Sequence, residues 1–180
     1  VSWDSYPQWT AGEKDIDIAC ESAFNHDLMR GTGDGKPFML MESSPSSTNG
    51  GPVAKLHRPG GHLLQSIQAV AHGADTVQYF QFRKSRGSYE KFHGAVVDHE
   101  GSENTRVFGE VAKVGETLKK LDGIIGCGIE AKIAIVFDWE NRWAISESKG
   151  MLQENNKYEK TVVNHYKTFW KKGIPVDIID

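Results

Sequence analysis

One carboxylate, Glu42, stands at the end of an unbroken apolar run. The run covers residues 37–41, and Ser43, Ser44 and Pro45 follow the glutamate. An apolar run of this length between turn residues predicts a strand buried on both faces, as in a parallel sheet. Ligands of α/β barrels and open α/β sheets bind at the carboxyl ends of the strands. Glu42 is therefore a candidate for chemistry, and a solvated glutamate that opens a loop is the alternative.

Polar side chains also follow the neighbouring predicted strands. Tyr6 ends the first strand, and Arg83 ends the third, which leads into a segment that carries Glu90 and His93. Because the carboxyl ends of parallel strands lie at one edge of a sheet, we expect these groups on one rim with Glu42. Chain order and parallel pairing together produce this convergence, which favours a functional role for Glu42.

A carboxylate at such a rim can be a nucleophile, a general base or a metal ligand. His93, Asp98 and His99 lack the spacing of a strong metal-ligand set, so no metal site is expected within the chain. Serine chemistry lacks a G-x-S-x-G elbow. Cys20 lies in the middle of a predicted helix, which is a poor setting for a reactive thiolate.

Glycoside hydrolysis fits the rim better than these chemistries. Retaining glycosidases use one carboxylate as a nucleophile and a second carboxyl group as acid and then base. Glu42 could be the nucleophile, while Glu90 and His93 could hydrogen-bond sugar hydroxyls. No acid/base partner is evident in the chain, so we expect it upstream.

Strands and helices alternate along the sequence. We expect strands at 1–6, 37–42, 74–83, 131–137 and 174–179, and helices at 15–30, 61–73, 104–122 and 158–172. Such alternation predicts an α/β architecture with a parallel sheet. A closed eight-stranded barrel needs about 250 residues, so most of a barrel would lie upstream of Val1. Both ends look cut, and we place a domain boundary near residues 123–128.

Four local features refine this prediction. Gly31 is expected to end the first helix. Leu64, Ile67 and Ala71 are expected to form the buried face of the second helix. The run 94–97 is a candidate for a short extra strand. The long polar loop at 43–61, which holds Asn49, is expected to be functional or disordered.

Composition excludes several classes of protein. The chain has 180 residues and a formal net charge of −3, with scattered basic residues that form no nucleic-acid stripe. No apolar run approaches the length of a membrane span. Cys20 and Cys127 lie far apart in apolar surroundings, so both are expected to be buried free thiols, as in a reducing, cytoplasmic compartment.

Five segments resemble one known family in order and spacing. The chain is similar to glycoside hydrolase family 42 β-galactosidases at Phe38–Ser43, Gln68–Asp75, Tyr79–Gly87, Glu90–Ala95 and Phe137–Asn141. The resemblance implies the last strand–helix units of a (β/α)8 TIM barrel in residues 1–123. It implies the start of a flavodoxin-like trimerisation domain in residues 124–180, and a homotrimer in the intact protein.

The resemblance also implies roles for individual residues. Glu42 resembles the nucleophile on the seventh strand, and Glu90 and His93 match the galactose-binding pair after the eighth strand. Tyr6 resembles a tyrosine near the nucleophile. Asn49 and Arg83 are further candidate substrate-binding residues. The implied activity is retaining hydrolysis of terminal non-reducing β-D-galactosyl residues, without a cofactor.

Two departures from the family leave alternatives open. The family usually has a tryptophan directly after the asparagine that is Asn49 here, whereas this chain has Gly50. The acid/base glutamate and the family's cysteine metal cluster have no counterpart in this chain, so a structural zinc would be upstream and the fragment alone is expected to be inactive. A non-catalytic carbohydrate-binding or assembly relative, and a barrel glycosidase for another sugar such as an arabinoside, are the alternatives.

Overall fold

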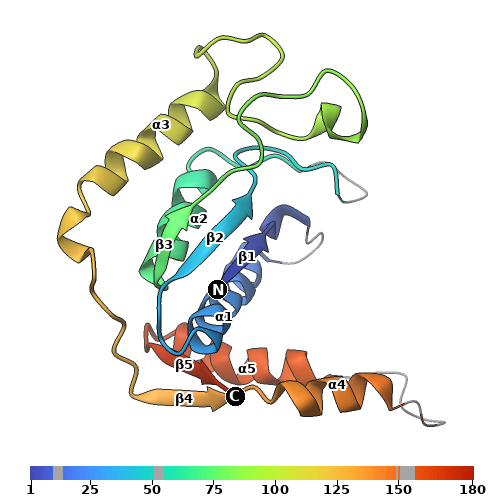
Figure 1. Cartoon of the computed structure of the whole chain (residues 1–180), viewed down its shortest axis with the longest axis vertical. Helices are drawn as coiled ribbons and strands as arrows, with labels where there is room; N and C mark the ends of the chain where they lie inside the picture. Colours follow the sequence, from blue (N-terminus) through green and yellow to red (C-terminus); the bar gives the residue numbers. More distant parts are fainter. Residues whose placement is uncertain (10–13, 51–54, 149, 151–156) are drawn as a thin grey trace.

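Two parallel sheets organise the chain in the computed structural model, which describes residues 1–9, 14–50, 55–148, 150 and 157–180 (Figure 1). The first sheet has the order β1-β2-β3, with β1 at Ser2–Ser5, β2 at Phe38–Ser43 and β3 at Ala74–Val77. The second sheet pairs β4, Ile133–Val136, with β5, Val176–Ile179. All pairings are parallel, as the alternation of elements predicts.

Five α-helices accompany these strands in the described part of the chain. They are α1 at Asp15–Thr32, α2 at Gly61–Ala71, α3 at Arg106–Lys119, α4 at Trp139–Glu147 and α5 at Tyr158–Trp170. Three short 3-10 helices lie at Pro7–Trp9 (η1), Tyr89–Phe92 (η2) and Asp122–Ile124 (η3). None of the described helices is long and apolar enough to cross a membrane.

The central strand β2 is fully buried on one face and only partly buried on the other. Phe38 and Leu40 are fully buried against Met29 of α1 and Ala69 of α2. Met41, on the other face, is 43 % exposed, so the prediction of burial on both faces was wrong for this chain. The physical reason is that α1 and α2 cover one side of a sheet of only three strands.

Strand β3 is shorter than expected, and the chain changes partner after Phe80. The amides of Gln78 and Phe80 still donate to the β2 carbonyls of Leu40 and Ser43, at 3.0 and 2.8 Å. From Gln81 on, the partner is the run 94–97: the amides of Val96 and Val97 donate to the carbonyls of Gln81 and Phe82, at 2.9 and 2.8 Å. The run 94–97 therefore makes an isolated parallel bridge between Arg83 and Val97, not the extra strand we considered.

Two expectations about the helices are corrected. Helix α1 continues through Gly31 to Thr32. Glycine at position 31 instead makes room for the backbone of β5, since an added Cβ would lie 1.7 Å from the Ile178 carbonyl oxygen. The buried face of α2 is mostly polar, with His62, Gln65, Ser66 and Ala69 buried, whereas Leu64 is 70 % exposed.

Helix α4 was not predicted. The helix begins after Asp138, whose side chain accepts a hydrogen bond from the Asn141 amide at 2.8 Å. An aspartate in this position is a strong N-cap signal. The sequence therefore carried the information for this helix.

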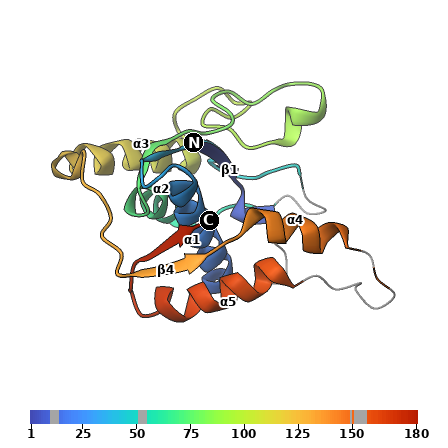
Figure 2. The ribbon, with the colours of Figure 1, turned by 60° about the horizontal axis from the view of Figure 1, so that its bottom comes forward.

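Helix α1 belongs to the cores of both sheets. Cys20, Ala23, Phe24 and Leu28 pack with buried residues of the second sheet and α5, namely Phe137, Val162, Tyr166, Val176 and Ile178. Figure 2 shows α1 beside β5 and α5. The Cys20 thiol lies in this core, where burial raises its pKa to about 11. Cys127 is exposed, which corrects the expectation that both thiols are buried.

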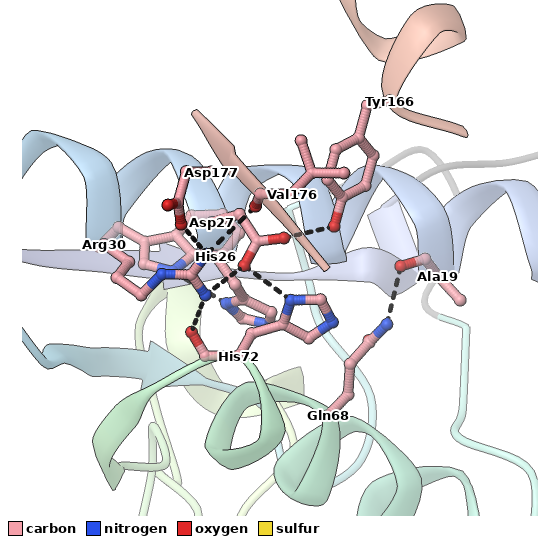
Figure 3. A network of polar contacts seen from close by, with 10 residues as sticks. Ala19, His26, Asp27, Arg30, Gln68, His72, Tyr166, Val176 and Asp177 are labelled. Carbon is pink, nitrogen blue, oxygen red and sulfur yellow. Dashed lines mark hydrogen bonds and ion pairs between the residues drawn. The ribbon is translucent and has the colours of Figure 1, made fainter. Parts of the chain in front are cut away.

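A buried ionic network ties α1 to the second sheet (Figure 3). The Arg30 guanidinium donates to Asp27 Oδ1 at 2.7 Å and to Asp177 Oδ1 at 3.0 Å. It also donates to the carbonyls of His72 and Val176, each at 3.1 Å. One arginine thus connects α1, the end of α2 and β5.

Asp27 is the second centre of this network. Its Oδ2 accepts from the Tyr166 hydroxyl of α5 at 2.5 Å, and its Oδ1 lies 2.9 Å from His72 Nδ1. Burial, followed by the charge of Asp27, raises the pKa of Tyr166, so the phenol stays a donor. A buried carboxylate with several partners is the arrangement that makes burial of its charge tolerable.

Candidate active site

The carboxyl ends of β1 and β2 bring polar groups side by side. In the strand register Asp4 is the partner of Glu42, and Ser5 is the partner of Ser43. Tyr6 follows directly after β1. The expected rim is therefore formed by parallel pairing, and Glu42 lies at its centre.

A hydrogen bond joins the two central residues: the Tyr6 hydroxyl donates to Glu42 Oε1. Burial raises the pKa of Tyr6, and the bond to Glu42 together with the charges of Glu42, Asp4 and Glu90 raises it further. Tyr6 therefore stays protonated at neutral pH and holds one carboxylate oxygen. Burial and the charge of Glu42 also raise the pKa of Asp4.

Glu90 enters the rim from η2 and is held by the loop that follows β2. Asn49 Nδ2 donates to Glu90 Oε2 at 3.2 Å and to the Tyr89 carbonyl at 2.6 Å. Gln81 Nε2 donates to the Glu90 carbonyl at 3.4 Å. Asn49 therefore holds the side chain of Glu90, and Gln81 holds its backbone.

His93 is buried beside Tyr6, with 3 % of its surface exposed. Its Nδ1 lies 2.9 Å from the Gly94 carbonyl oxygen, which can only accept, so Nδ1 carries the proton. With Nδ1 as the donor, Nε2 is the ring atom that remains for another partner. The ring packs edge-to-face against Tyr6 and Phe80, with centroid distances of 5.9 and 4.9 Å.

Gly94 explains how the excursion with Glu90 and His93 reaches the rim. The Gly94 amide donates to the Ser47 carbonyl at 2.7 Å. A Cβ on Gly94 would lie 2.6 Å from the Ser47 amide nitrogen and 2.7 Å from Ser46 Cβ. Only glycine permits this approach, so the excursion can pack on the loop that carries Asn49.

Arg83 is the one candidate that no observed contact joins to this group. Its side chain is exposed and lies toward Gly101, where an added Cβ would be 3.3 Å from Nη2. Tyr6 contacts Glu42 and His93, and Asn49 contacts Glu90. The His93 amide joins the two groups by donating to the Glu90 carbonyl at 3.1 Å.

Trp9 is a site neighbour that sequence reasoning missed. It ends η1, and its indole stacks on the Tyr6 ring with a centroid distance of 4.5 Å and an interplanar angle of 11°. Its position three residues after Tyr6, in the turn that leaves β1, was the available signal. The indole also lies against Gly50.

Metal ligands are not grouped in the described ranges: no three or more His, Cys, Asp or Glu side chains there could hold a metal ion together. The sequence neighbours Asp98 and His99 make other contacts. Asp98 pairs with Lys84 at 3.3 Å, and His99 Nε2 lies 2.7 Å from the Ser85 carbonyl oxygen.

A rim of carboxylates and hydroxyl-binding groups after parallel strands is typical of barrel hydrolases that act on sugars. Comparison with known proteins agrees with this class. Residues 1–121 match the sequence profile of the family described as β-galactosidase, and residues 131–180 match the profile of the β-galactosidase trimerisation domain. The chain therefore belongs to the glycoside hydrolase family 42 β-galactosidases.

Individual relatives are similar over the whole chain. β-Galactosidase Pbg of Clostridium perfringens is 59 % identical over 180 residues, which are 100 % of this chain and 26 % of the relative. The crystal structure of a β-galactosidase from Rahnella sp. R3 matches with a TM-score of 0.95 and 56 % identity, over 99 % of this chain and 26 % of that one. A catalytic mutant of Gan42B, a family 42 β-galactosidase from G. stearothermophilus, matches with a TM-score of 0.94 and 50 % identity over the same shares.

The chain thus spans about a quarter of the length of the relatives that it matches. Its α/β fold, with part of a TIM barrel followed by the start of a second α/β unit, is confirmed by these structures.

Proposed function

We propose that the protein containing this chain is a retaining β-galactosidase and that Glu42 is its nucleophile. The observation that carries this proposal is the Tyr6–Glu42 hydrogen bond at the carboxyl ends of parallel strands, in a chain of this family. The substrate is a terminal non-reducing β-D-galactosyl residue, and this choice is supported by the similarity to the β-galactosidases of Clostridium perfringens and Rahnella.

The proposed reaction has two steps. A Glu42 carboxylate oxygen attacks the anomeric carbon, the glycosidic bond breaks, and an acid/base carboxyl outside this chain protonates the leaving oxygen. That same group then deprotonates a water molecule, which displaces Glu42 and releases galactose with retained configuration. Tyr6 orients Glu42 throughout because its raised pKa keeps it a donor.

The remaining site residues bind the sugar in this proposal. The Glu90 carboxylate accepts hydrogen bonds from galactose hydroxyls, and Asn49 orients it. His93 offers Nε2 as an acceptor, since Nδ1 is committed to the Gly94 carbonyl. Arg83 is retained as a substrate-binding candidate.

Replacement of the nucleophile tests this function. In the intact protein, Glu42→Ala should reduce kcat by at least about 10⁴-fold because no covalent intermediate can form. Glu116→Ala, a change at an exposed carboxylate of α3, serves as the control and should retain full activity. Near-normal turnover of a folded Glu42→Ala variant would remove Glu42 from the mechanism.

We also infer that the intact protein is a homotrimer. Residues 131–180 match the trimerisation-domain profile, which supports a division into residues 1–123 and 124–180. Light scattering of the intact protein should give three times the protomer mass. A monomer or dimer would contradict this assembly.

A cytoplasmic location is the last part of the proposal. Both cysteines are free thiols, which a reducing compartment maintains. Recovery of the protein from the culture medium of intact cells would contradict it.

A further inference from the structure

Trp9 is placed at the site by the turn that ends β1. The Trp9 amide donates to the Tyr6 carbonyl at 3.0 Å, which closes η1 and folds the indole back over the Tyr6 ring. The stacked Tyr6 hydroxyl donates to Glu42. Half of the Trp9 surface, 50 %, nevertheless remains exposed. Tyr6 alone therefore separates this exposed aromatic surface from the proposed nucleophile, Glu42.

Gly50 supplies the room for this indole. A Cβ on Gly50 would lie 2.7 Å from both Cε2 and Cζ2 of Trp9 and 2.9 Å from its Nε1. The backbone of Gly50 is not in the left-handed region, so its conformation does not require glycine. The need for glycine is one of space: a side chain at position 50 and the observed indole of Trp9 exclude one another.

The surroundings of the indole match both the polar and the apolar surface of a hexose. Gly50 directly follows Asn49, which binds Glu90, so groups for hydroxyls lie next to the ring. A pyranose presents hydroxyls at its rim and a patch of C–H groups on its face. Such a ligand fits an aromatic surface flanked by a few polar groups.

We propose that Trp9 is the aromatic platform of the galactosyl-binding subsite and that Gly50 is the small residue that admits it. This inference rests on the proposed function, since it names a contact of the same site. In this chain the platform is supplied from the turn after β1, and the loop after β2 contributes only the space. The galactosyl ring contacts Trp9 whatever the leaving group is.

If Trp9 only supported Tyr6, the effect of removing Trp9 would differ from the effect that we expect for a sugar contact. If Trp9 acted only by holding Tyr6 against Glu42, its loss would have no effect once the Tyr6 hydroxyl is absent. If Trp9 contacts the sugar, its loss weakens galactose binding in either background. The two roles are therefore separated by a double-mutant cycle that measures binding of free galactose.

The test uses the intact protein and calorimetric titration with galactose. Trp9→Ala should weaken binding by about tenfold, which corresponds to one good aromatic contact. The same factor should appear in the Tyr6→Phe background. Gly50→Ala should also weaken binding, because its methyl group displaces the indole. Trp143→Ala, at a tryptophan of α4 that is 53 % exposed, is the matched control and should bind galactose normally.

Substrate comparison completes the test. Trp9→Ala should lower kcat/KM by a similar factor for an aryl galactoside and for a galactosyl disaccharide. Unchanged galactose binding in Trp9→Ala, or an effect that vanishes in Tyr6→Phe, would overturn the inference. If wild-type protein hydrolyses galactosides and Glu42→Ala does not, the proposed function stands even when the Trp9 result is negative.

Discussion

Glu42 is held through one of its two carboxylate oxygens, which suits a nucleophile because the other oxygen can react. Oε1 accepts a hydrogen bond from Tyr6, whereas Oε2 accepts none from the residues that the structure describes. The phenol supplies a neutral donor, because its pKa is raised by burial and by the nearby carboxylates. Asp4, the register partner of Glu42, adds a second acidic group beside it. The resulting negative potential suits a transition state with oxocarbenium character.

At the same scale, Glu90 is expected to bind the transition state. Glu90→Ala should remove about 2–3 kcal/mol of transition-state stabilisation, as calculated from the ratio of kcat/KM values, because a charge-assisted hydrogen bond to a galactose hydroxyl is lost. Steady-state kinetics with an aryl galactoside measures this change. Glu103→Ala, which alters an exposed carboxylate in the loop before α3, is the control. An unchanged kcat/KM in Glu90→Ala would place Glu90 outside the site.

The elements position these groups mainly through close backbone approaches. The segment 81–84 leaves β3 and pairs with 94–97, which turns the chain back toward the loop after β2. Gly94 allows the two loops to touch at Ser46 and Ser47. Glu90 and His93 therefore reach the rim from a region without regular strands.

This packing predicts an effect of one methyl group. Gly94→Ala should reduce kcat/KM by about 10-fold or more while the protein remains folded, because a displacement near 1 Å at a catalytic site can cost about 10²-fold. Gly87→Ala is the matched control, since a Cβ there meets nothing within 4 Å. Equal activities of the two variants would show that the loop approach at Gly94 does not position the site.

Regular elements and strand tips were predictable, whereas close approaches between distant segments were not. Alternation and apolar runs gave β1, β2, β4 and β5, and the expected rim residues Tyr6 and Glu42 are joined. The apolar pattern predicted the wrong buried face for α2. Its buried face is polar because His62 packs against the Tyr79 ring and Ser66 hydrogen-bonds the Tyr79 hydroxyl. Gly31 resembled a helix terminator, but its role is set by β5, which lies nearly 150 residues further along the chain.

In the whole molecule, α1 is the element that connects the two sheets. Its apolar side chains enter the core of the second sheet, and Arg30 and Asp27 bond to β5 and α5 (Figure 3). Such a network is costly to break on one side only, by about 3–5 kcal/mol, because the remaining charge stays buried. The part matched by the trimerisation-domain profile is therefore fixed to the barrel part by both apolar and ionic contacts.

A pair of glycine substitutions tests this connection. Gly31→Ala should lower the apparent melting temperature of the intact protein, because its Cβ would lie 1.7 Å from the Ile178 carbonyl oxygen and β5 would have to move. Gly115→Ala in α3 has open space and should stabilise by about 0.5–1 kcal/mol through helix propensity. Thermal unfolding measures both. A Gly31→Ala protein as stable as Gly115→Ala would contradict the observed approach of β5.

Covalent trapping of the intact protein tests the central claim most directly. A 2-deoxy-2-fluoro-galactosyl inhibitor with a good leaving group such as fluoride traps the covalent ester. The 2-fluorine slows both steps and the leaving group accelerates only the first, so the nucleophile stays labelled for peptide mapping by mass spectrometry. We predict that the label lies on Glu42, and that Tyr6→Phe slows its formation without moving it. A label on a peptide that lacks Glu42 would contradict the assignment of the nucleophile.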